Sequence, residues 1–347
     1  MMIIEKETNN DTNIPLKNKE ENFISNETTE EINKKFHPGI YELNFIGKGG
    51  SSKIYEGKIQ KTKTNVIIKV MEKGKNIGNN INEVKIMSKL RNKNIITMYG
   101  YSVGKKSKCN FIMMEKGKYD LRNFLNKVLK RRISSETFLN FIAFQIMKGL
   151  FYLYKNNIVH YDIKPQNIIM TDFLDAKIID FSVSKYIGDI KDEKVQLHYR
   201  GTSFYMAPEV IKTNTINVQD YHKIDLFSLG VMLYVLAFGE RPFNLNHDDC
   251  DNDETIYNKM MTDWKVENIN GTEYSPHFLN FLNRLLETDI EKRMNIYEAM
   301  NHYWIKGGYI LMEEKENICN ANVFLTDLIT DHFSTFNDYL QQNSSEN

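Results

Sequence analysis

Three polar side chains lie close together in the stretch HYDIKPQNIIM, residues 160–170. Asp162 could accept the proton of an incoming hydroxyl group, provided that the loop holds the carboxylate in place. Lys164 would lie near a transferring phosphoryl group, and Asn167 could ligate a metal ion. The spacing of these residue types therefore predicts a catalytic loop. The bulky Tyr161 beside the Asp is the unexplained member of the stretch.

Two other sites in the chain carry candidate functional groups. Lys69 lies within the apolar stretch VIIKV, where burial of an unpaired cation is costly. Glu83, on the next predicted helix, could neutralise it, and the alternative is a lysine that extends into solvent. Asp180 ends the apolar stretch IID, and a carboxylate at a strand end is a natural Mg²⁺ ligand, although many strands end in Asp without binding metal.

A glycine cluster occurs in IGKGGSSKI, residues 46–54. Gly47 and Gly49 would allow backbone amides to approach phosphate groups, but Ser52 stands where a third glycine would complete the pattern. A plain hairpin turn explains the cluster equally well. The stretch is not a Walker A motif, because no Gly-Lys-Ser/Thr opens a helix.

These groups must be positioned by two kinds of secondary structure. Apolar and polar residues alternate in the first part of the chain, which predicts strands over 41–59 (around the glycine cluster), 65–72, 94–103 and 109–116, with one helix over 80–90. After Gly117 a 3.6-residue period predicts helices over 119–130 and 135–157, the second capped by Ser134 or Ser135. Short strands at 167–170 and 176–180, an irregular segment to Glu209 and several helices to about Trp304 follow. This order predicts an α+β fold with a strand-rich lobe, a helical lobe and a cleft between them.

The composition excludes several classes of protein. The 347 residues contain 45 basic and 45 acidic side chains, and this balance argues against a dedicated nucleic-acid binder. The longest apolar run, residues 231–238, is too short to span a bilayer, and no secretory signal is visible, so we expect no membrane partner. Cys109, Cys250 and Cys319 are far apart and odd in number, which favours an intracellular, reducing compartment.

The two ends of the chain and one loop differ from the rest. Residues 1–37 are polar and poor in aromatics, which predicts a disordered N-terminal arm, and 307–347 form a C-terminal extension without a motif. The acidic loop 244–254 begins like a calcium loop, but Glu254 replaces the required Gly and Met260 the bidentate Glu. A solvated loop is the better interpretation, although steering of basic substrates is a further option.

Three more motifs follow the catalytic loop: GTSFYMAPEV (201–210), KIDLFSLGVMLY (223–234) and DIEKRMNIYEAMNHYW (289–304). Glu209 and Arg293 could form a buried ion pair, and Asp225 could anchor a central helix. With all motifs in order from Tyr41 to Trp304, the chain resembles the eukaryotic-type serine/threonine protein kinases. The resemblance implies a bilobal kinase domain over 38–306, with an N-lobe of about 38–115 and a C-lobe of about 118–306.

The resemblance also implies a role for each site residue. Asp162 would be the catalytic base and Lys164 a phosphate contact, while Asn167 and Asp180 would hold Mg²⁺. Lys69 would contact ATP and pair with Glu83. The complete set expected to bind ATP is Ile46, Gly47, Lys48, Gly49, Gly50, Ser51, Ser52, Ile54, Ile67, Lys69, Glu83, Met114, Glu115, Gly117 and Ile169. Met114 would be the gatekeeper, and Glu115–Gly117 the hinge.

Three positions depart from the family pattern. Tyr161 replaces an Arg that commonly binds a phosphate on the activation segment, so we expect activity without that phosphorylation; Lys185 is a candidate substitute. Ser182 replaces the Gly of Asp-Phe-Gly, which predicts fewer flipped conformers. Ile67 replaces an Ala against adenine, so Ile67→Ala should keep or improve ATP affinity.

Several alternatives remain open at this point. An ATP-binding scaffold without turnover is the main one, and a small-molecule kinase is disfavoured by the segment 201–210. The stretches GGSSKIYEG and MEKGKYDL faintly resemble dual-specificity kinases of the spindle checkpoint. The composition, rich in Asn, Lys and Ile, suggests an AT-rich genome such as that of a protist or a large DNA virus. The expected location is the cytoplasm or nucleus, or the host cytoplasm for a viral protein.

Overall fold

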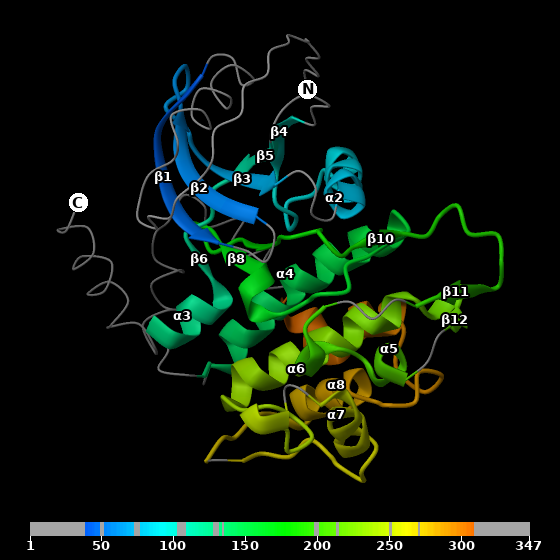
Figure 1. Ribbon diagram of the computed structural model, residues 1–347. Helices are drawn as coiled ribbons and strands as arrows, with labels where there is room; N and C mark the ends of the chain where they lie inside the picture. The colour runs from blue at the N-terminus through cyan, green and yellow to red at the C-terminus, as the bar shows by residue number, and fades with distance from the viewer. Residues whose placement is uncertain are drawn as a thin grey trace. The chain divides into compact units, whose positions relative to one another are not determined.

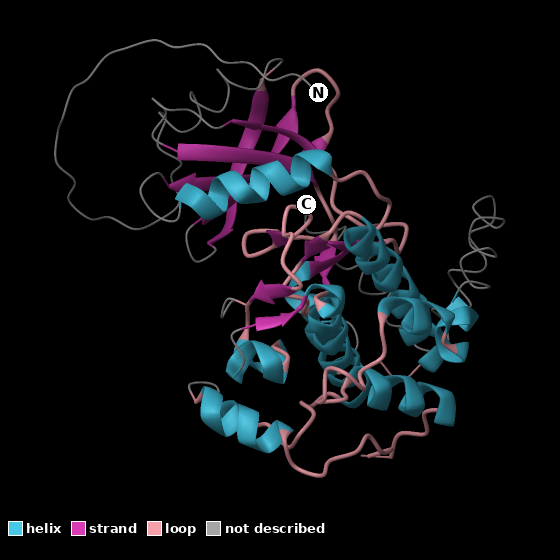
Figure 2. Cartoon of the chain, turned by 90° about the vertical axis from the view of Figure 1, so that its right-hand side faces the viewer, coloured by secondary structure: helices cyan, strands magenta, loops and turns pink. Residues whose placement is uncertain are grey.

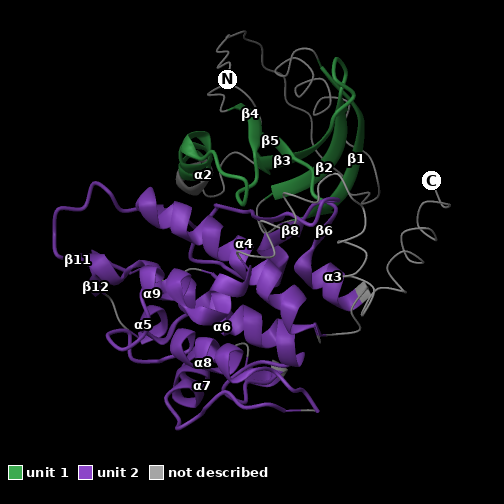
Figure 3. Cartoon of the chain, turned by 180° about the vertical axis from the view of Figure 1, so that it is seen from behind, with its two compact units in different colours: residues 1–117 green, residues 118–347 purple. Residues whose placement is uncertain are grey.

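The computed structural model describes residues 39–48, 52–72, 77–102, 109–127, 132–133, 135–197, 201–212, 215–249, 252–269 and 271–308. The chain divides into two compact units, residues 1–117 and 118–347, which are treated one at a time below (Figure 3). The predicted N-terminal arm lies outside the described residues, as does the predicted C-terminal extension apart from Gly307 and Gly308.

The first unit is built on a five-stranded antiparallel sheet with one helix beside it (Figure 1). The strand order is β1-β2-β3-β5-β4. The bounds are β1 Ile40–Lys48, β2 Ser52–Ile59, β3 Asn65–Glu72, β4 Met98–Ser102 and β5 Cys109–Glu115, and the helix is α2, Ile77–Lys89. This confirms the predicted small antiparallel sheet with one helix.

Alternation along β3 divides the sheet into two faces. Val66, Ile68 and Val70 are buried in the core of this unit, together with Ile40, Tyr55, Phe111 and Met113 from the neighbouring strands. Ile67 and Lys69 therefore lie on the opposite face, because successive side chains of a strand point to opposite sides. The period of two that predicted the strands also decides which side chains can meet a ligand.

One predicted strand is shorter than its apolar pattern. The sequence predicted a strand over 94–103, whereas β4 begins at Met98. Ile95 and Ile96 are buried, but Ile95 forms only an isolated β-bridge directly after the turn at residues 93–94, and Ile96 lies in irregular backbone. The apolar run here therefore reflects burial more than continuous strand pairing.

The second unit is mainly helical (Figure 2). Its helices are α3 Leu121–Lys127, α4 Glu136–Lys155, α5 Pro208–Lys212, α6 His222–Phe238, α7 Asp253–Met260, α8 Pro276–Leu285 and α9 Ile296–Asn301. Short strands join in three small sheets: β6 (Tyr119–Asp120) with β8 (Ile168–Met170) and β9 (Ala176–Ile178); β7 (Ile158–Val159) with β10 (Lys185–Tyr186); and β11 (Lys194–Gln196) with β12 (Thr215–Asn217).

Helices α4 and α6 form the centre of this unit. Ser135 caps α4, because its hydroxyl accepts a hydrogen bond from the Phe138 amide at 3.2 Å. Helix α6 is apolar on nearly all sides and ends at Gly239, whose φ of 76° is the left-handed conformation that glycine adopts freely. By length and composition the segment Val218–Phe238 could span a bilayer, but 94% of its most apolar window is buried inside the unit. The burial accounts for its apolar character.

Several features of this unit were not predicted, among them the pairing of β7 with β10. In the ribbon of β11 and β12, which buries Val195 and Ile216, β11 lies in the segment to Glu209 predicted to be irregular and β12 in the part after it predicted to be helical. Strands of three residues are too short to show a period, so only tertiary pairing reveals them. The helix predicted over 119–130 begins at Leu121, since Tyr119 and Asp120 pair with β8.

Candidate active site

In the first unit, several residues predicted to bind ATP share one face of the sheet. Register pairs Ile54 with Lys69 and Ile67 with Met114. These four side chains lie opposite the face that carries the core. Of the remaining predicted residues, Gly49, Gly50 and Ser51 lie outside the described part of the chain. Apolar side chains around a single cation suit an adenine ring joined to phosphates.

The cation on this face is held by an ion pair. The Lys69 Nζ lies 2.7 Å and 2.9 Å from the two carboxylate oxygens of Glu83, which extends from α2. Lys69 is 9% exposed and Glu83 1%. Removing one partner of such a buried pair leaves an uncompensated charge, at a cost of about 3–5 kcal/mol. The pair therefore fixes both the charge of Lys69 and its position on β3.

The other predicted residues of this unit lie around the same sheet. Ile46, Gly47 and Lys48 form the end of β1, and Ser52 is a buried residue that begins β2. The Glu115 amide donates to the Thr97 carbonyl at 2.9 Å, which fixes the end of β5. Gly117 is the last residue of this unit.

In the second unit, the Asp162 carboxylate is held by side chains from two segments. Lys164 Nζ lies 2.6 Å from Oδ2, and the Thr202 hydroxyl donates to Oδ1 at 2.8 Å. Lys164 also donates to the Thr202 oxygen at 2.6 Å, which closes a triangle of three polar groups. The Asn167 amide donates to Oδ2 and to the Asp162 carbonyl, each at 2.8 Å. A carboxylate fixed in this way is preorganised to accept a proton.

The backbone of this loop is anchored to the core of the unit. Asp225, which is buried in the first turn of α6, accepts hydrogen bonds from the His160 amide at 2.8 Å and the Tyr161 amide at 2.9 Å. The His160 ring packs edge-on against Phe181 with 5.0 Å between ring centroids. Its Nε2 lies 3.0 Å from the Ile179 carbonyl oxygen. Asp225 thus anchors the backbone of the predicted catalytic loop to α6.

Tyr161 is part of the buried core of the second unit. Its side chain is 4% exposed, and its φ of 68° turns the backbone before Asp162. Gly201 packs directly against this turn: a Cβ added to Gly201 would lie 2.3 Å from the Tyr161 carbonyl oxygen. Gly201 also has a φ of 107°, so this position requires glycine for two separate reasons.

The predicted metal ligands lie next to one another along paired backbone. The Ile179 amide, directly before Asp180, donates to the Asn167 carbonyl at 2.9 Å. Because the Asn167 Nδ2 is used by Asp162, its Oδ1 oxygen can face a cation, and oxygen donors suit Mg²⁺. No cluster of three or more His, Cys, Asp or Glu placed to hold a metal occurs in the described residues. The two residues fit a Mg²⁺ ion that shares its coordination with water and substrate phosphates.

Two other predicted residues lie near this loop in the sequence. Asp180 has a φ of 64°, whereas Ser182 is not among the positive-φ residues, so its backbone does not require glycine. The prediction of fewer flipped conformers therefore stays a prediction. Ile169 lies between the buried Ile168 and Met170 on β8, which directs its side chain to the opposite, half-buried side.

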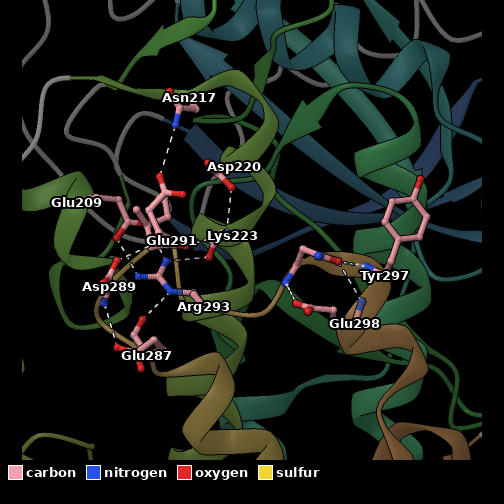
Figure 4. A network of polar contacts seen from close by, with 12 residues as sticks. Glu209, Asn217, Asp220, Lys223, Glu287, Asp289, Glu291, Arg293, Tyr297 and Glu298 are labelled. Carbon is pink, nitrogen blue, oxygen red and sulfur yellow. Dashed lines mark hydrogen bonds and ion pairs between the residues drawn. The ribbon is translucent and has the colours of Figure 1, made fainter.

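A buried ion pair joins Glu209, in the segment after Thr202, to Arg293 (Figure 4). Arg293 donates to both oxygens of Glu209, at 2.7 Å and 2.9 Å, and to the Lys223 and Glu287 carbonyls. Its guanidinium also lies 4.7 Å from the ring centroid of Phe227. Since every polar group of this fully buried cation has a partner, the pair that the sequence suggested is also well satisfied.

Comparison with known proteins adds independent information. The protein kinase domain family matches residues 41–305. The chain is 30% identical over 279 residues to "Aurora kinase" of Schizosaccharomyces pombe, which covers 78% of this chain and 73% of that protein. It is 32% identical over 278 residues to "CBL-interacting serine/threonine-protein kinase 14" of Arabidopsis thaliana, and the match covers 59% of that protein. The match to human "Serine/threonine-protein kinase D3" is 28% and covers 29% of that protein.

Proposed function

The chain belongs to the protein kinase family, and on that premise we propose that it transfers the γ-phosphoryl group of MgATP to serine or threonine hydroxyls of proteins. The observation that carries this proposal is the fixed Asp162 carboxylate, held by Lys164, Thr202 and Asn167. The names of the similar proteins support the serine/threonine class.

Each described residue contributes a separate part of the reaction. Asp162 orients the substrate hydroxyl and accepts its proton as the oxygen attacks the γ-phosphorus and the bond from that phosphorus to ADP breaks. The Lys164 cation, 2.6 Å from the base, stabilises charge on the transferring group. Asn167 and Asp180 would hold Mg²⁺, which supplies charge neutralisation on the phosphate oxygens when it is bound. Lys69 would bind phosphate oxygens of ATP, with Glu83 keeping its ammonium in place.

An ATP-binding scaffold without turnover is the second candidate. Such a protein usually lacks one of the groups that perform the chemistry. This chain retains all four of these groups: Lys69, Asp162, Asn167 and Asp180. The departures from the family pattern, at Tyr161, Ser182 and Ile67, concern regulation and the shape of the adenine pocket and not the chemical groups. The retained groups therefore favour an active enzyme.

Phosphotransfer from labelled ATP to a library of peptides tests the proposal. We expect Asp162→Asn to lower the rate by about 10²- to 10⁴-fold, because it removes the proton acceptor. Asp172→Asn is the matched control, since that carboxylate is 70% exposed and pairs only with Lys118 in the described part of the chain. Equal phosphotransfer by the wild-type protein and Asp162→Asn would reject an active kinase and favour the scaffold.

A further inference from the structure

The segment that follows Thr202 forms a platform next to the predicted base. Residues 203–205 form the short 3₁₀ helix η2, and Thr202 itself bonds to Asp162. The Arg241 guanidinium carbon lies 3.8 Å from the ring centroid of Phe204, the middle residue of this turn. Arg241 follows the C-terminus of α6 and is half-buried. A cation is thus fixed by stacking on the platform itself.

A second arginine approaches the same platform from α3. Arg122 is exposed in the first turn of α3, a helix that contacts the catalytic loop at residues 165–167. Both cations affect the hydroxyl of Tyr205. Burial raises the pKa of Tyr205 to about 12, the positive charges of Arg241 and Arg122 lower this pKa, and the negative charge of Asp162 raises it further. The two guanidinium groups and the predicted base therefore all lie near enough to Tyr205 to affect its pKa.

Neither arginine is neutralised within the described residues. No described carboxylate lies within ion-pair distance, 4.0 Å, of Arg122 or Arg241. The carboxylates of Glu240, Asp263 and Glu267 line a cavity of about 620 Å³ together with Arg241, and none of them forms an ion pair with it. The cations are thus available for a ligand.

Two carboxylates of the acidic loop 244–254, those of Asp249 and Glu254, already have cationic partners. The Asp249 carboxylate accepts from the Asn246 amide and from Lys259 Nζ, each at 2.8 Å. Glu254 pairs with Lys212 at 3.3 Å. Charges that are already paired contribute little to recognition of a basic segment. The charge that contacts the platform itself is the Arg241 cation, and the acidic residues Glu240, Asp263 and Glu267 line the neighbouring cavity.

From this arrangement we propose that the chain prefers serine or threonine hydroxyls flanked by acidic or phosphorylated residues, which Arg122 and Arg241 bind. The inference rests on the proposed function and names its substrate class. Guanidinium groups suit both carboxylates and phosphates, because their planar N–H donors match two oxygens at once. Binding of such residues would lower KM and leave the proton transfer at Asp162 unchanged.

The test uses three peptides of equal length in which one serine is flanked by Glu, by Ala or by Lys. We expect kcat/KM to follow the order Glu, Ala, Lys, and a phosphoserine-flanked peptide to match or exceed the Glu peptide. Arg122→Gln and Arg241→Gln should each raise KM for the Glu peptide about fivefold, the upper range for an exposed ion pair, with kcat unchanged. Neither should affect the Ala peptide. Added salt should weaken the preference.

Two further variants separate recognition from packing. Arg284→Gln is the matched control, since the Arg284 side chain is 42% exposed and pairs with Glu298 at 3.6 Å. Arg241→Lys keeps the charge but not the planar pair of donors and should retain part of the preference, whereas Arg241→Met keeps an apolar contact with Phe204 without the charge and should weaken the preference as much as Arg241→Gln does. Equal kcat/KM for the three peptides, or a Glu preference unchanged in both Gln variants, would overturn the inference.

Binding is measured separately from turnover, so that the two proposals can fail independently. Fluorescence anisotropy follows labelled peptides in which Ala replaces the serine. Tighter binding of the Glu peptide that depends on Arg122 and Arg241 supports the inference even if no peptide is phosphorylated, a result that would reject only the active kinase. Phosphorylation of all peptides at one rate, with equal binding, would reject only the acidic preference.

Discussion

Replacing Gly201 with Ala places a methyl group where the structure has no room for one. The added Cβ would lie 2.3 Å from the Tyr161 carbonyl oxygen and 3.5 Å from Asp162 Oδ1. The first contact involves backbone, which cannot rotate away as a side chain can. The backbone φ of 107° at this position adds a second cost, because residues with a Cβ rarely adopt it.

The size of the effect follows from these distances. Cβ contacts shorter than 3.0 Å essentially do not occur, so the Tyr161 carbonyl or the Gly201 backbone must move by about 0.7 Å. A displacement of 1 Å at catalytic groups can lower the rate about 100-fold, which predicts a 10- to 100-fold loss of kcat here. Backbone strain should also remove about 1–3 kcal/mol of unfolding free energy.

The assay measures kcat, KM for ATP and chemical denaturation in three variants. Gly271→Ala is the control for strain, since Gly271 has a φ of 68° but nothing within 4 Å of its added Cβ; it should lose stability and keep kcat. Gly47→Ala has neither structural cost and serves as a control for stability only, because Gly47 is among the residues predicted to bind ATP. KM for ATP should change less than about twofold in Gly201→Ala, because the contact distorts only the loop of the base. A kcat in Gly201→Ala within twofold of that in Gly271→Ala would refute this reasoning.

Three other predictions concern stability and control. Arg293→Met should lower the unfolding free energy in urea by about 3–5 kcal/mol, because it leaves the buried Glu209 carboxylate unpaired, and adding Glu209→Gln should recover part of the loss. Burial lowers the pKa of His222 to about 4, and the ordinary value is 6.5, so the unfolded chain binds a proton first as the pH falls. Stability should therefore decrease from about pH 6.5 toward pH 4, by about 2 kcal/mol at pH 5, in denaturation curves, and His222→Phe should remove this dependence. Because Tyr161 is a core residue, phosphatase treatment should leave the rate of phosphotransfer unchanged; a loss that a mapped phosphosite within 182–203 restores would contradict this.

The sequence predicted those parts of the site that depend on local spacing. One short loop contains Asp162, Lys164 and Asn167. Their contacts could be predicted because they depend only on the conformation of a few neighbouring residues. The pairing of Lys69 with Glu83 could be predicted for a different reason, since a lysine in an apolar strand needs a nearby anion.

The parts that could not be predicted depend on contacts between distant segments. The approach of Gly201 to Tyr161 joins residues far apart in the chain, and a lone glycine carries no sign of its neighbour. The sequence showed only that Tyr161 replaces an arginine of the family pattern. Its burial could not be predicted, because tyrosine occurs both in cores and on surfaces. Arg122 and Arg241 are far apart in the sequence and belong to no recognisable pattern. Their shared position near residues 203–205 could therefore be found only from the folded structure.

Asp225 has a consequence for the dynamics of the catalytic loop. Its carboxylate accepts the His160 and Tyr161 amides from within α6, where it is 4% exposed. Those two amide hydrogens cannot reach water unless the loop detaches from the most buried helix of the second unit. We therefore expect them to exchange with deuterium as slowly as the amides of α6 itself, through cooperative unfolding of the whole unit. The loop proposed to perform the chemistry would then be among the most protected segments of the second unit's described residues.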